Sequence, residues 1–462
     1  MLREWQKECS EAALEKYQSG SPHFLCLASP GAGKTVMAAE VARKMLELKL
    51  VDLILCFAPS SVVVASIEST FSHILQRNFN GGLGAVGAAY TYHSLMYFDK
   101  SFWKSLQMHR VLVIFDEIHH CTGDSLDNAN VWGGEILSQV QQCASYSLAL
   151  TGTPWRTDST PIVLSNYTDP DGEICCDYVY GLHEAIVDGV CRKPKIALIN
   201  SNNLVYSSKD NVQFFGSITD FLSETVASYQ SIIWHPEAMK YVLEAGCKKL
   251  NEIRKVNSDA GGLVVASSVE HAYKILNILE KEFDQTAIIV TYHDRDALAK
   301  IGYYRQSTTE WIVSVGMISE GTDIPRLQVC CHLSSVKTEL YFRQVLGRIL
   351  RVNQSENQEA WLFTMATNEL TLFSNRLAED LPEDYKVMQQ QSDDWSFPTI
   401  DSQSMPPEFM RKNGISKIKE IDLEMDIGEI TKSSPTISSQ TKQLKMGSMH
   451  QQVIDAFLFS II

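Results

Sequence analysis

Short apolar runs rich in β-branched residues alternate with stretches of helical periodicity along most of the chain. In the first half these runs are residues 24–27, 51–57, 111–115 and 147–150, and in the second half they are 262–266, 287–290, 311–315, 329–333 and 361–363. Nearly continuous apolarity predicts strands that are buried on both faces, which is typical of a parallel sheet covered by helices. We therefore expect an α/β protein with two doubly wound parallel-sheet domains in tandem.

The same pattern predicts where the domains begin and end. The first domain is expected at residues 1–199, and the second at 258–370. Between them, residues 200–257 have helical spacing and few strand signals, so we expect a helical connector or insertion there. Residues 371–462 are polar and loop-like, which predicts a partly disordered C-terminal extension. Its last residues, 453–462, are apolar enough to need a partner surface on this chain or on another.

Composition narrows the class of protein. The chain has 462 residues, of which 45% are hydrophobic and 21% charged, an ordinary globular balance that excludes collagen-like, rod-like and mucin-like proteins. The formal net charge of −15 confines any nucleic-acid contact to a local groove. Charged residues near the start and the lack of a long apolar run argue against a secretory signal or a membrane span. The 11 cysteines include no Cys-x-x-Cys pair, so we expect reduced thiols and a cytoplasmic protein.

Residues 28–35, Ala-Ser-Pro-Gly-Ala-Gly-Lys-Thr, follow an apolar run and open a helical stretch. Glycines let backbone N–H groups approach a phosphate, and the helix N-terminus favours an anion. Lys34 would neutralise the β- and γ-phosphates, and the Thr35 hydroxyl would bind Mg²⁺. Ala28 replaces the first glycine of the strict pattern. The predicted nucleotide-binding residues of this loop are Pro30, Gly31, Ala32, Gly33, Lys34 and Thr35.

Two adjacent carboxylates, Asp116 and Glu117, follow the apolar run 111–115. They are therefore expected at the carboxyl end of a strand, beside the phosphates. Asp116 suits Mg²⁺, which prefers oxygen ligands, and Glu117 would orient and deprotonate the attacking water. Adjacent acids at a strand end are also common in solvated turns, so this pair alone leaves both interpretations open.

Three further motifs complete an ordered set. They are residues 151–154 (Thr-Gly-Thr-Pro), 319–325 (Ser-Glu-Gly-Thr-Asp-Ile-Pro) and 344–351 (Gln-Val-Leu-Gly-Arg-Ile-Leu-Arg). With the loop and the Asp-Glu-x-His box, the chain resembles superfamily 2 helicases of the DEAD/DEAH-box type over residues 1 to about 370. It is most similar to the branch that contains restriction-enzyme motor subunits and DNA-repair translocases. The resemblance implies two RecA-like domains with ATP bound between them.

The resemblance also assigns roles to individual residues. Gln344, Arg348 and Arg351 are spaced to share one helical face, and the two arginines match the family's arginine fingers. Gln6 matches the opening motif, in which a glutamine recognises adenine. The other matched positions are Arg3 in the same motif, Gly321 at the γ-phosphate, Asp323 at the ribose, and His119, Thr151 and Thr153, which couple hydrolysis to the nucleic-acid groove.

Four residues match positions that track a nucleic-acid strand in the family: Ser60, Thr91, His93 and Ser267. Small hydroxyl residues suit phosphate contacts that carry no sequence information. They are equally suited to capping the ends of strands and helices, so a purely structural role stays open. The variant Thr-Gly-Thr in place of Ser-Ala-Thr occurs in DNA translocases and favours DNA over RNA. No nuclease motif or Cys/His metal cluster is evident, so a cutting partner would be another chain.

These observations predict an ATP- and Mg²⁺-dependent helicase or translocase that acts on nucleic acid, DNA rather than RNA. One alternative is an RNA helicase with the same chemistry. Another is an ATP-gated recognition subunit that clamps nucleic acid and recruits an effector, such as a nuclease of a restriction or defence system, through the C-terminal tail.

Overall fold

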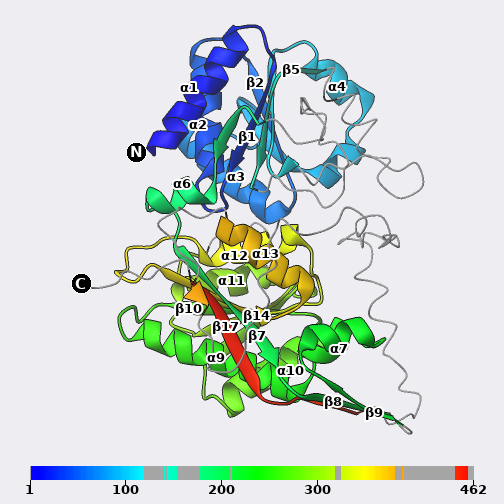
Figure 1. Cartoon of the computed structure of the whole chain (residues 1–462). Coiled ribbons are helices and arrows are strands. Elements are labelled where there is room, and N and C mark those ends of the chain that lie inside the picture. The colour runs from blue at the N-terminus through cyan, green and yellow to red at the C-terminus, as the bar shows by residue number, and fades with distance from the viewer. Residues whose placement is uncertain are drawn as a thin grey trace.

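The fold is taken from a computed structural model, which describes residues 2–118, 140, 143–152, 176–208, 211–317, 324–379, 388–389 and 443–455. Two α/β units lie one above the other, the first drawn in blue and cyan and the second in green, yellow and red (Figure 1). Helix α12 (Glu339–Ile349) lies at the side of the second unit that faces the first (Figure 1). In the described part of the chain no helix combines the length and the apolarity needed to cross a membrane.

The first unit is built on a six-stranded sheet in the order β3-β2-β4-β5-β1-β6. Every pairing in it is parallel. Its strands are β1 (His23–Ala28), β2 (Leu53–Ala58), β3 (Gly87–Thr91), β4 (Val111–Phe115), β5 (Ala144–Thr151) and β6 (Tyr178–Tyr180). Strand β5 lies between β1 and β4, so the segments that follow these three strands emerge side by side at one edge of the sheet.

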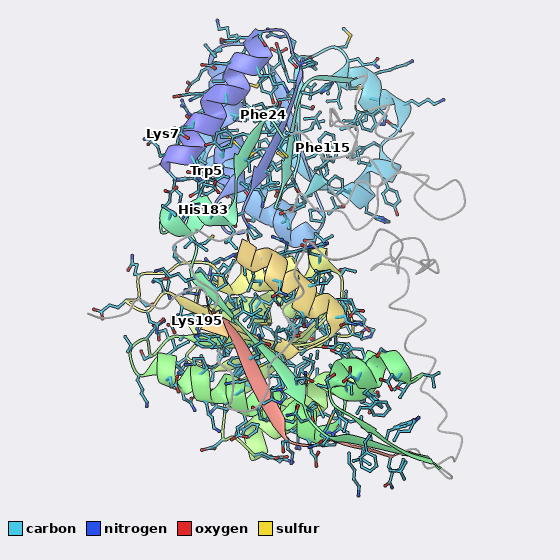
Figure 2. All side chains as sticks on the ribbon, viewed as in Figure 1. Trp5, Lys7, Phe24, Phe115, His183 and Lys195 are labelled. Carbon is cyan, nitrogen blue, oxygen red and sulfur yellow. The ribbon has the colours of Figure 1, made fainter. Side chains whose placement is uncertain are left out.

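Different helices cover the two faces of the first sheet. Cys26 and Ile114 point to one face, where they pack with α1, α2 and α3. Phe57 and Phe115 point to the other face, pack with α4, and stack with their ring centroids 5.9 Å apart. Phe115 is labelled in Figure 2. The alternation of side chains along each strand explains why almost every strand position is apolar. The helical elements are α1 (Glu4–Gln18), α2 (Lys34–Glu47), α3 (Ser61–Leu75), the 3₁₀ turn η1 (Tyr92–Tyr97), α4 (Lys100–Leu106) and α6 (Leu182–Val187).

The second unit is built on an eight-stranded sheet in the order β11-β12-β10-β13-β14-β7-β17-β15. Its strands are β7 (Lys193–Ser201), β10 (Gly261–Ala266), β11 (Ala287–Thr291), β12 (Trp311–Val315), β13 (Leu327–Leu333), β14 (Glu359–Met365), β15 (Met388–Gln389) and β17 (Met449–Asp455). From β11 to β7 all pairings are parallel. Besides α12, its longer helices are α9 (Pro236–Arg254), α10 (Val269–Lys281), α11 (Ala297–Gln306) and α13 (Asn368–Glu379).

Strand β7 lies in the second sheet, where it pairs with β14 from Lys193 to Ile199. The sequence pattern places residues up to 199 in the first domain, so the structure moves this boundary to a point before residue 193. An apolar strand looks the same whichever sheet it joins, because the pattern reports burial and not the partner strand.

The expected helical connector also contains a strand pair. Helices α7 (Ile218–Glu224) and α8 (Tyr229–Ile233) are present together with α9, as the spacing predicts. Ahead of them, β8 (Leu204–Ser208) and β9 (Asn211–Phe215) form a hairpin. The hairpin was missed because its strands are short and half polar. It joins β16 (Gln443–Lys445) in a small separate sheet.

Part of the C-terminal extension is integrated into the second unit. Strand β17 pairs antiparallel with β7 along Met449–Asp455 and lies beside it in red in Figure 1. Ile454 is 5% exposed, so this part of the apolar terminal segment finds its partner surface on this chain. Residues 456–462 and most of the polar extension lie outside the described residues.

Candidate functional site

The loop between β1 and α2 has the backbone that a phosphate cradle requires. Gly31 and Gly33 have φ values of 83° and 91°, in the left-handed region that favours glycine. Gly33 is the N-cap of α2, so the loop ends at the N-terminus of a 14-residue helix. A β-carbon on Gly33 would lie 2.7 Å from Nε2 of Gln6, which explains why no larger residue fits here.

Helix α1 supports this loop from the side. The Arg3 guanidinium donates to the carbonyl of Ala32 at 2.6 Å, and the Gln6 amide donates to the carbonyl of Gly33 at 3.0 Å. Gln6 Oε1 also accepts from the Arg3 backbone N–H at 2.9 Å, which fixes the start of the helix. Trp5 stacks on Tyr180, with ring centroids 4.7 Å apart, and so attaches α1 to β6 (Figure 2). Both predicted adenine-motif residues therefore contact the loop backbone.

Lys34 and Glu117 form an ion pair across the strand ends. Lys34 Nζ lies 3.1 Å from Oε1 of Glu117 and donates to the carbonyl of Ala28 at 3.2 Å. The backbone N–H of Gly152, just after β5, donates to Glu117 Oε2 at 2.9 Å. The site thus joins the segments that follow β1, β4 and β5, as the expected location at the carboxyl ends of the strands requires.

Two backbone features make this arrangement possible. Glu117 has a φ of 52°, which is costly for a residue with a side chain and is seen mostly where the surroundings impose it. A β-carbon on Gly152 would lie 2.9 Å from Lys34 Nζ and 3.3 Å from Glu117 Oε1. The glycine of the Thr-Gly-Thr motif therefore leaves space for the ion pair. The motif marks this residue, but its spatial role follows only from the fold.

Asp116 is held by its main chain at the end of β4. Its N–H donates to the carbonyl of Phe57 at 2.8 Å, and its carbonyl accepts from the Tyr92 hydroxyl at 2.8 Å. Its side chain is largely buried, and Thr35 lies in the first turn of α2. A hydroxyl and a carboxylate beside a glycine loop form a donor set that fits Mg²⁺.

The arginine-bearing helix of the second unit lies against the loop of the first. A β-carbon on Gly347 would lie only 2.6 Å from Cβ of Pro30. A β-carbon on Gly31 would lie 3.2 Å from Cγ of Arg351. Gln344 and Arg348 lie on α12, which ends at Ile349, whereas Arg351 follows the helix and forms an isolated bridge with Cys191. The three residues therefore do not share the single helical face that their spacing predicts, although Gly347 and Arg351 both lie against the loop. The structure therefore brings the arginine segment and the loop together, as the sequence predicts.

Cationic side chains converge on the same place. Burial is the main cause that raises the pKa of the Cys191 thiol, to about 11, and three positive charges oppose that shift. These charges are Arg3, Arg351 and Lys34, which come from α1, from the end of α12 and from the start of α2. Three cations from separate elements around a glycine loop make a site suited to a polyphosphate.

The predicted strand-tracking residues have clear local roles. Ser60 and Thr91 are the N-caps of α3 and η1, accepting hydrogen bonds from Val63 and Ser94. Ser267 accepts from the Trp234 indole at 2.9 Å and contacts Nδ1 of His271 at 2.9 Å. These contacts fit the structural alternative, and the nucleic-acid role remains a prediction.

Of the remaining predicted residues, two are described by the structure and four are not. His93 lies in η1 and contacts the Tyr97 hydroxyl at 3.2 Å. Thr151 is fully buried at the end of β5. The remaining predicted residues, His119, Thr153, Gly321 and Asp323, lie outside the described residues.

Comparison with known proteins supports the class of protein that the sequence predicts. A family model described as the type III restriction enzyme, res subunit, matches residues 1–156. An uncharacterized protein of Mycobacterium leprae is 30% identical over 391 residues, which cover 81% of this chain. This chain spans 64% of the length of that relative. The DNA 3'-5' translocase XPB2 of Sulfurisphaera tokodaii is 24% identical over 401 residues, covering 81% of this chain and 84% of the relative.

Solved structures agree on the fold. A fragment of a putative HsdR subunit of a type I restriction enzyme from Vibrio vulnificus superposes with a TM-score of 0.57 at 18% identity, covering 82% of this chain and 67% of that one. The ATP-dependent Type ISP restriction-modification enzyme LlaBIII, bound to DNA, superposes with a TM-score of 0.52 at 14% identity, covering 79% of this chain and 28% of that one. The expected α/β fold with tandem RecA-like domains is thereby confirmed.

A glycine loop in one parallel-sheet unit, closed by an arginine-bearing helix from the other, defines a two-lobed protein with tandem RecA-like domains. Its sequence is similar to superfamily 2 helicases and to restriction-enzyme motor subunits.

Proposed function

We propose that this protein is an ATP-dependent translocase or helicase that acts on DNA in the cytoplasm and hydrolyses ATP between its two lobes. The observation that carries the proposal is the contact of Arg351 and Gly347 with the loop at Pro30 and Gly31, which makes one site from both lobes. One of the similar proteins, the XPB2 translocase, is named for DNA, and this supports DNA over RNA.

The chain's own residues supply most of the proposed chemistry. Backbone N–H groups of the loop and the Lys34 ammonium bind the β- and γ-phosphates. Arg348 and Arg351 stabilise the charge that develops on the transferred phosphoryl group. Thr35 and Asp116 would hold Mg²⁺, which would neutralise negative charge on the phosphates. The Glu117 carboxylate orients the attacking water and accepts its proton.

The proposed cycle of ATP binding and hydrolysis starts from the ion pair between Lys34 and Glu117. Phosphate oxygens compete with the Glu117 carboxylate for Lys34, so nucleotide binding releases the carboxylate for the water. Glu117 keeps its second contact, to the N–H of Gly152, at the start of the motif that follows β5. Binding at the loop is thereby linked to the segment that the family uses to contact nucleic acid. Movement of α12 toward and away from the loop then alternates with binding and release of the strand.

Glu117→Gln tests the assignment of the base. The variant keeps the shape of the side chain and an acceptor for Gly152, but it loses the charge that takes the proton. We expect ATP affinity to stay within about threefold and turnover to fall about 10²- to 10⁴-fold. ATP binding is measured with a fluorescent analogue and turnover as phosphate release. The matched control is Glu11→Gln on the exposed side of α1, and hydrolysis by Glu117→Gln at the control's rate would refute the assignment.

A stimulation panel tests the nucleic acid. ATPase is measured with single-stranded DNA, duplex DNA and RNA of equal length at one salt concentration, because phosphate contacts make affinity strongly dependent on salt. We expect either form of DNA to stimulate turnover more than RNA does. Stimulation by RNA alone would replace the DNA assignment with the RNA one. Strand displacement with the same duplex separates unwinding from translocation.

A further inference from the structure

The segment that connects the two lobes is bonded to both halves of the candidate site. The Cys191 thiol donates to the carbonyl of Pro30 at 3.5 Å. Cys191 also forms an isolated antiparallel bridge with Arg351, and the N–H of Arg192 donates to the carbonyl of Leu350 at 2.6 Å. The connection is therefore part of the site's framework, on the loop side and on the arginine side alike.

The side chain of Arg192 makes the most extensive of these contacts. It is completely buried, with an exposed fraction of 0%. Nη1 donates to the carbonyls of Leu327 at 2.5 Å and Ile349 at 3.3 Å, and Nη2 donates to the carbonyl of Pro325 at 2.9 Å. Nε donates to Oε1 of Gln358 at 3.2 Å. One guanidinium thus connects the segment between the lobes to the start of β13 and to the C-terminal end of α12.

A buried arginine in this setting needs a physical reason. Burial disfavours the charged form and lowers the pKa of Arg192 to about 10. Among the described residues no carboxylate pairs with it, and its acceptors are main-chain carbonyls and one amide oxygen. Carbonyls at the C-terminal end of α12 carry partial negative charge and suit a cation. A hydrophobic side chain would fill the same volume without the desolvation cost, so the contacts themselves account for an arginine here.

We propose that Arg192 is a positioning residue for the arginine fingers, an inference that rests on the proposed function. The carbonyls of Ile349 and Leu350, which accept from its side chain and its backbone N–H, lie between Arg348 and Arg351 in the chain. Fixing these two peptide groups fixes the main chain from which both finger side chains extend. In the part of the chain that the structure describes, the hydrogen-bond acceptors of the Arg192 side chain belong neither to the loop nor to the finger side chains.

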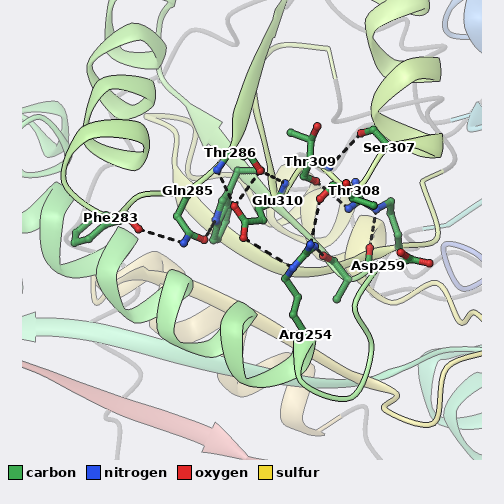
Figure 3. Close-up of polar contacts among 12 residues, drawn as sticks. Arg254, Asp259, Phe283, Gln285, Thr286, Ser307, Thr308, Thr309 and Glu310 are labelled. Atoms are coloured by element: carbon green, nitrogen blue, oxygen red, sulfur yellow. Dashed lines mark hydrogen bonds and ion pairs between the residues drawn. The ribbon is translucent and has the colours of Figure 1, made fainter.

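The chain provides a matched control in Arg326. It is also buried, at 6% exposed, and its guanidinium donates to three carbonyls, those of Asp259 at 2.7 Å, Tyr304 at 3.0 Å and Thr309 at 2.8 Å. Burial likewise lowers the pKa of its guanidinium. The cluster around these acceptors, with Asp259 and Thr309 labelled, is shown in Figure 3. None of these three acceptors belongs to α12, so a substitution here removes similar contacts away from the fingers.

The experiment compares Arg192→Lys with Arg326→Lys in the full chain. We expect Arg192→Lys to lower kcat about 10²-fold, as displacement of catalytic groups by an ångström does, with KM for ATP changed less than about threefold. Arg326→Lys is expected to keep kcat within about threefold at a comparable loss of stability in urea. Gln358→Leu removes the Nε partner together with the hydrogen bonds of the Gln358 amide to Asn353 and Ser355, and it is expected to lower kcat in the same direction by a smaller factor. It replaces Arg192→Lys if that variant does not fold.

Amide hydrogen exchange over residues 345–351 provides a readout that does not depend on activity. Exchange there is expected to become faster in Arg192→Lys and to stay unchanged in Arg326→Lys. Equal losses of kcat in both variants, or unchanged exchange over this segment in Arg192→Lys, would overturn the positioning role. If the unmodified protein hydrolyses no ATP with any nucleic acid, the proposed function fails, and the exchange experiment alone decides the role of Arg192.

Discussion

Glu117 shows how a single residue is held in an unfavourable backbone conformation. Its φ of 52° costs free energy for any residue other than glycine. The ion pair with Lys34 and the hydrogen bond from Gly152 compensate for that cost. These partners follow β1 and β5, so the conformation depends on the sheet order and not on the neighbouring sequence. At this scale a strained carboxylate beside the phosphate loop supports its assignment as the base.

Gln6 supports a prediction at the same scale. Its amide is 3% exposed and bonded at both ends to protein groups, which suggests that it acts on nucleotide through the loop. We expect Gln6→Ala to weaken ATP and GTP binding by a similar factor, about tenfold, because one loop hydrogen bond is lost for either nucleotide. Competition with a labelled analogue measures both affinities. A loss confined to ATP would instead show that the side chain reads adenine.

Helix α12 acts as a unit because one glycine sets its distance from the loop. The contact between Gly347 and Pro30 leaves no room for a β-carbon. Arg348 is the next residue on the same helix, and Arg351 follows just after the helix ends. Alanine favours a helix by about 1 kcal/mol over glycine, so the local effect of a Gly347→Ala change is stabilising. The same change destabilises the contact between the lobes, because the new methyl group would overlap Pro30.

Gly347→Ala is therefore expected to separate stability from activity. The added methyl group pushes α12 away from Pro30 and should lower ATP turnover by tenfold or more, on the order expected when a positioned group shifts. The unfolding midpoint in urea should not fall. The control is Gly302→Ala in α11, where a β-carbon meets nothing within 4 Å. Full turnover in Gly347→Ala would show that this contact does not set the site.

Strand β17 lies in the C-terminal extension and therefore limits which deletions can test a recruiting role of this extension. Deleting everything after residue 370, the simplest way to look for a recruiting role, would also remove a strand that pairs with β7 and would leave that sheet edge open. A cleaner deletion keeps residues 443–455 and β15, which pairs with β17, and removes only the segment between β15 and β16. The recruiting hypothesis stays a prediction until partner binding is measured with such a variant.

At the scale of the whole molecule, the two lobes share a site but have separate cores. The second lobe buries two histidines, and burial is the main cause that lowers the pKa of His271 and of His332 to about 4. A folded-state pKa below the unfolded value of 6.5 means that the unfolded chain binds the proton more tightly. The resulting stability is fully present above pH 6.5 and is lost as the pH falls toward 4.

The stability of the second lobe should therefore fall on acidification. His332 alone should contribute about 3 kcal/mol less to the free energy of unfolding near pH 4 than at pH 7. Urea unfolding followed by tryptophan fluorescence at several pH values measures the slope. We expect His332→Gln to reduce the slope and His109→Gln, at an exposed position, to leave it unchanged. An identical slope in the His332 variant would contradict the prediction.

The sequence by itself determined the fold class and predicted most residues of the candidate site. Buried parallel strands are nearly continuous in apolarity, and a phosphate loop needs glycines, a lysine and a hydroxyl at fixed spacing, so both leave local signals at Gly31, Lys34 and Asp116. The spacing of Arg348 and Arg351 predicts one helical face, but the helix ends at Ile349 and Arg351 lies beyond it. Signals of this kind survive in a single chain because each depends on a few adjacent residues.

Only the tertiary structure decided the rest, because it depends on residues that are distant in the chain. Nothing local distinguishes β7 from a strand of the first sheet, or Arg192 from a surface arginine. The pairing of β7 with β14, and the position of Arg192 between β13 and α12, arise when separate segments pack together. Most partners of Arg192 are main-chain carbonyls. Because every residue carries a carbonyl, no sequence pattern identifies these partners.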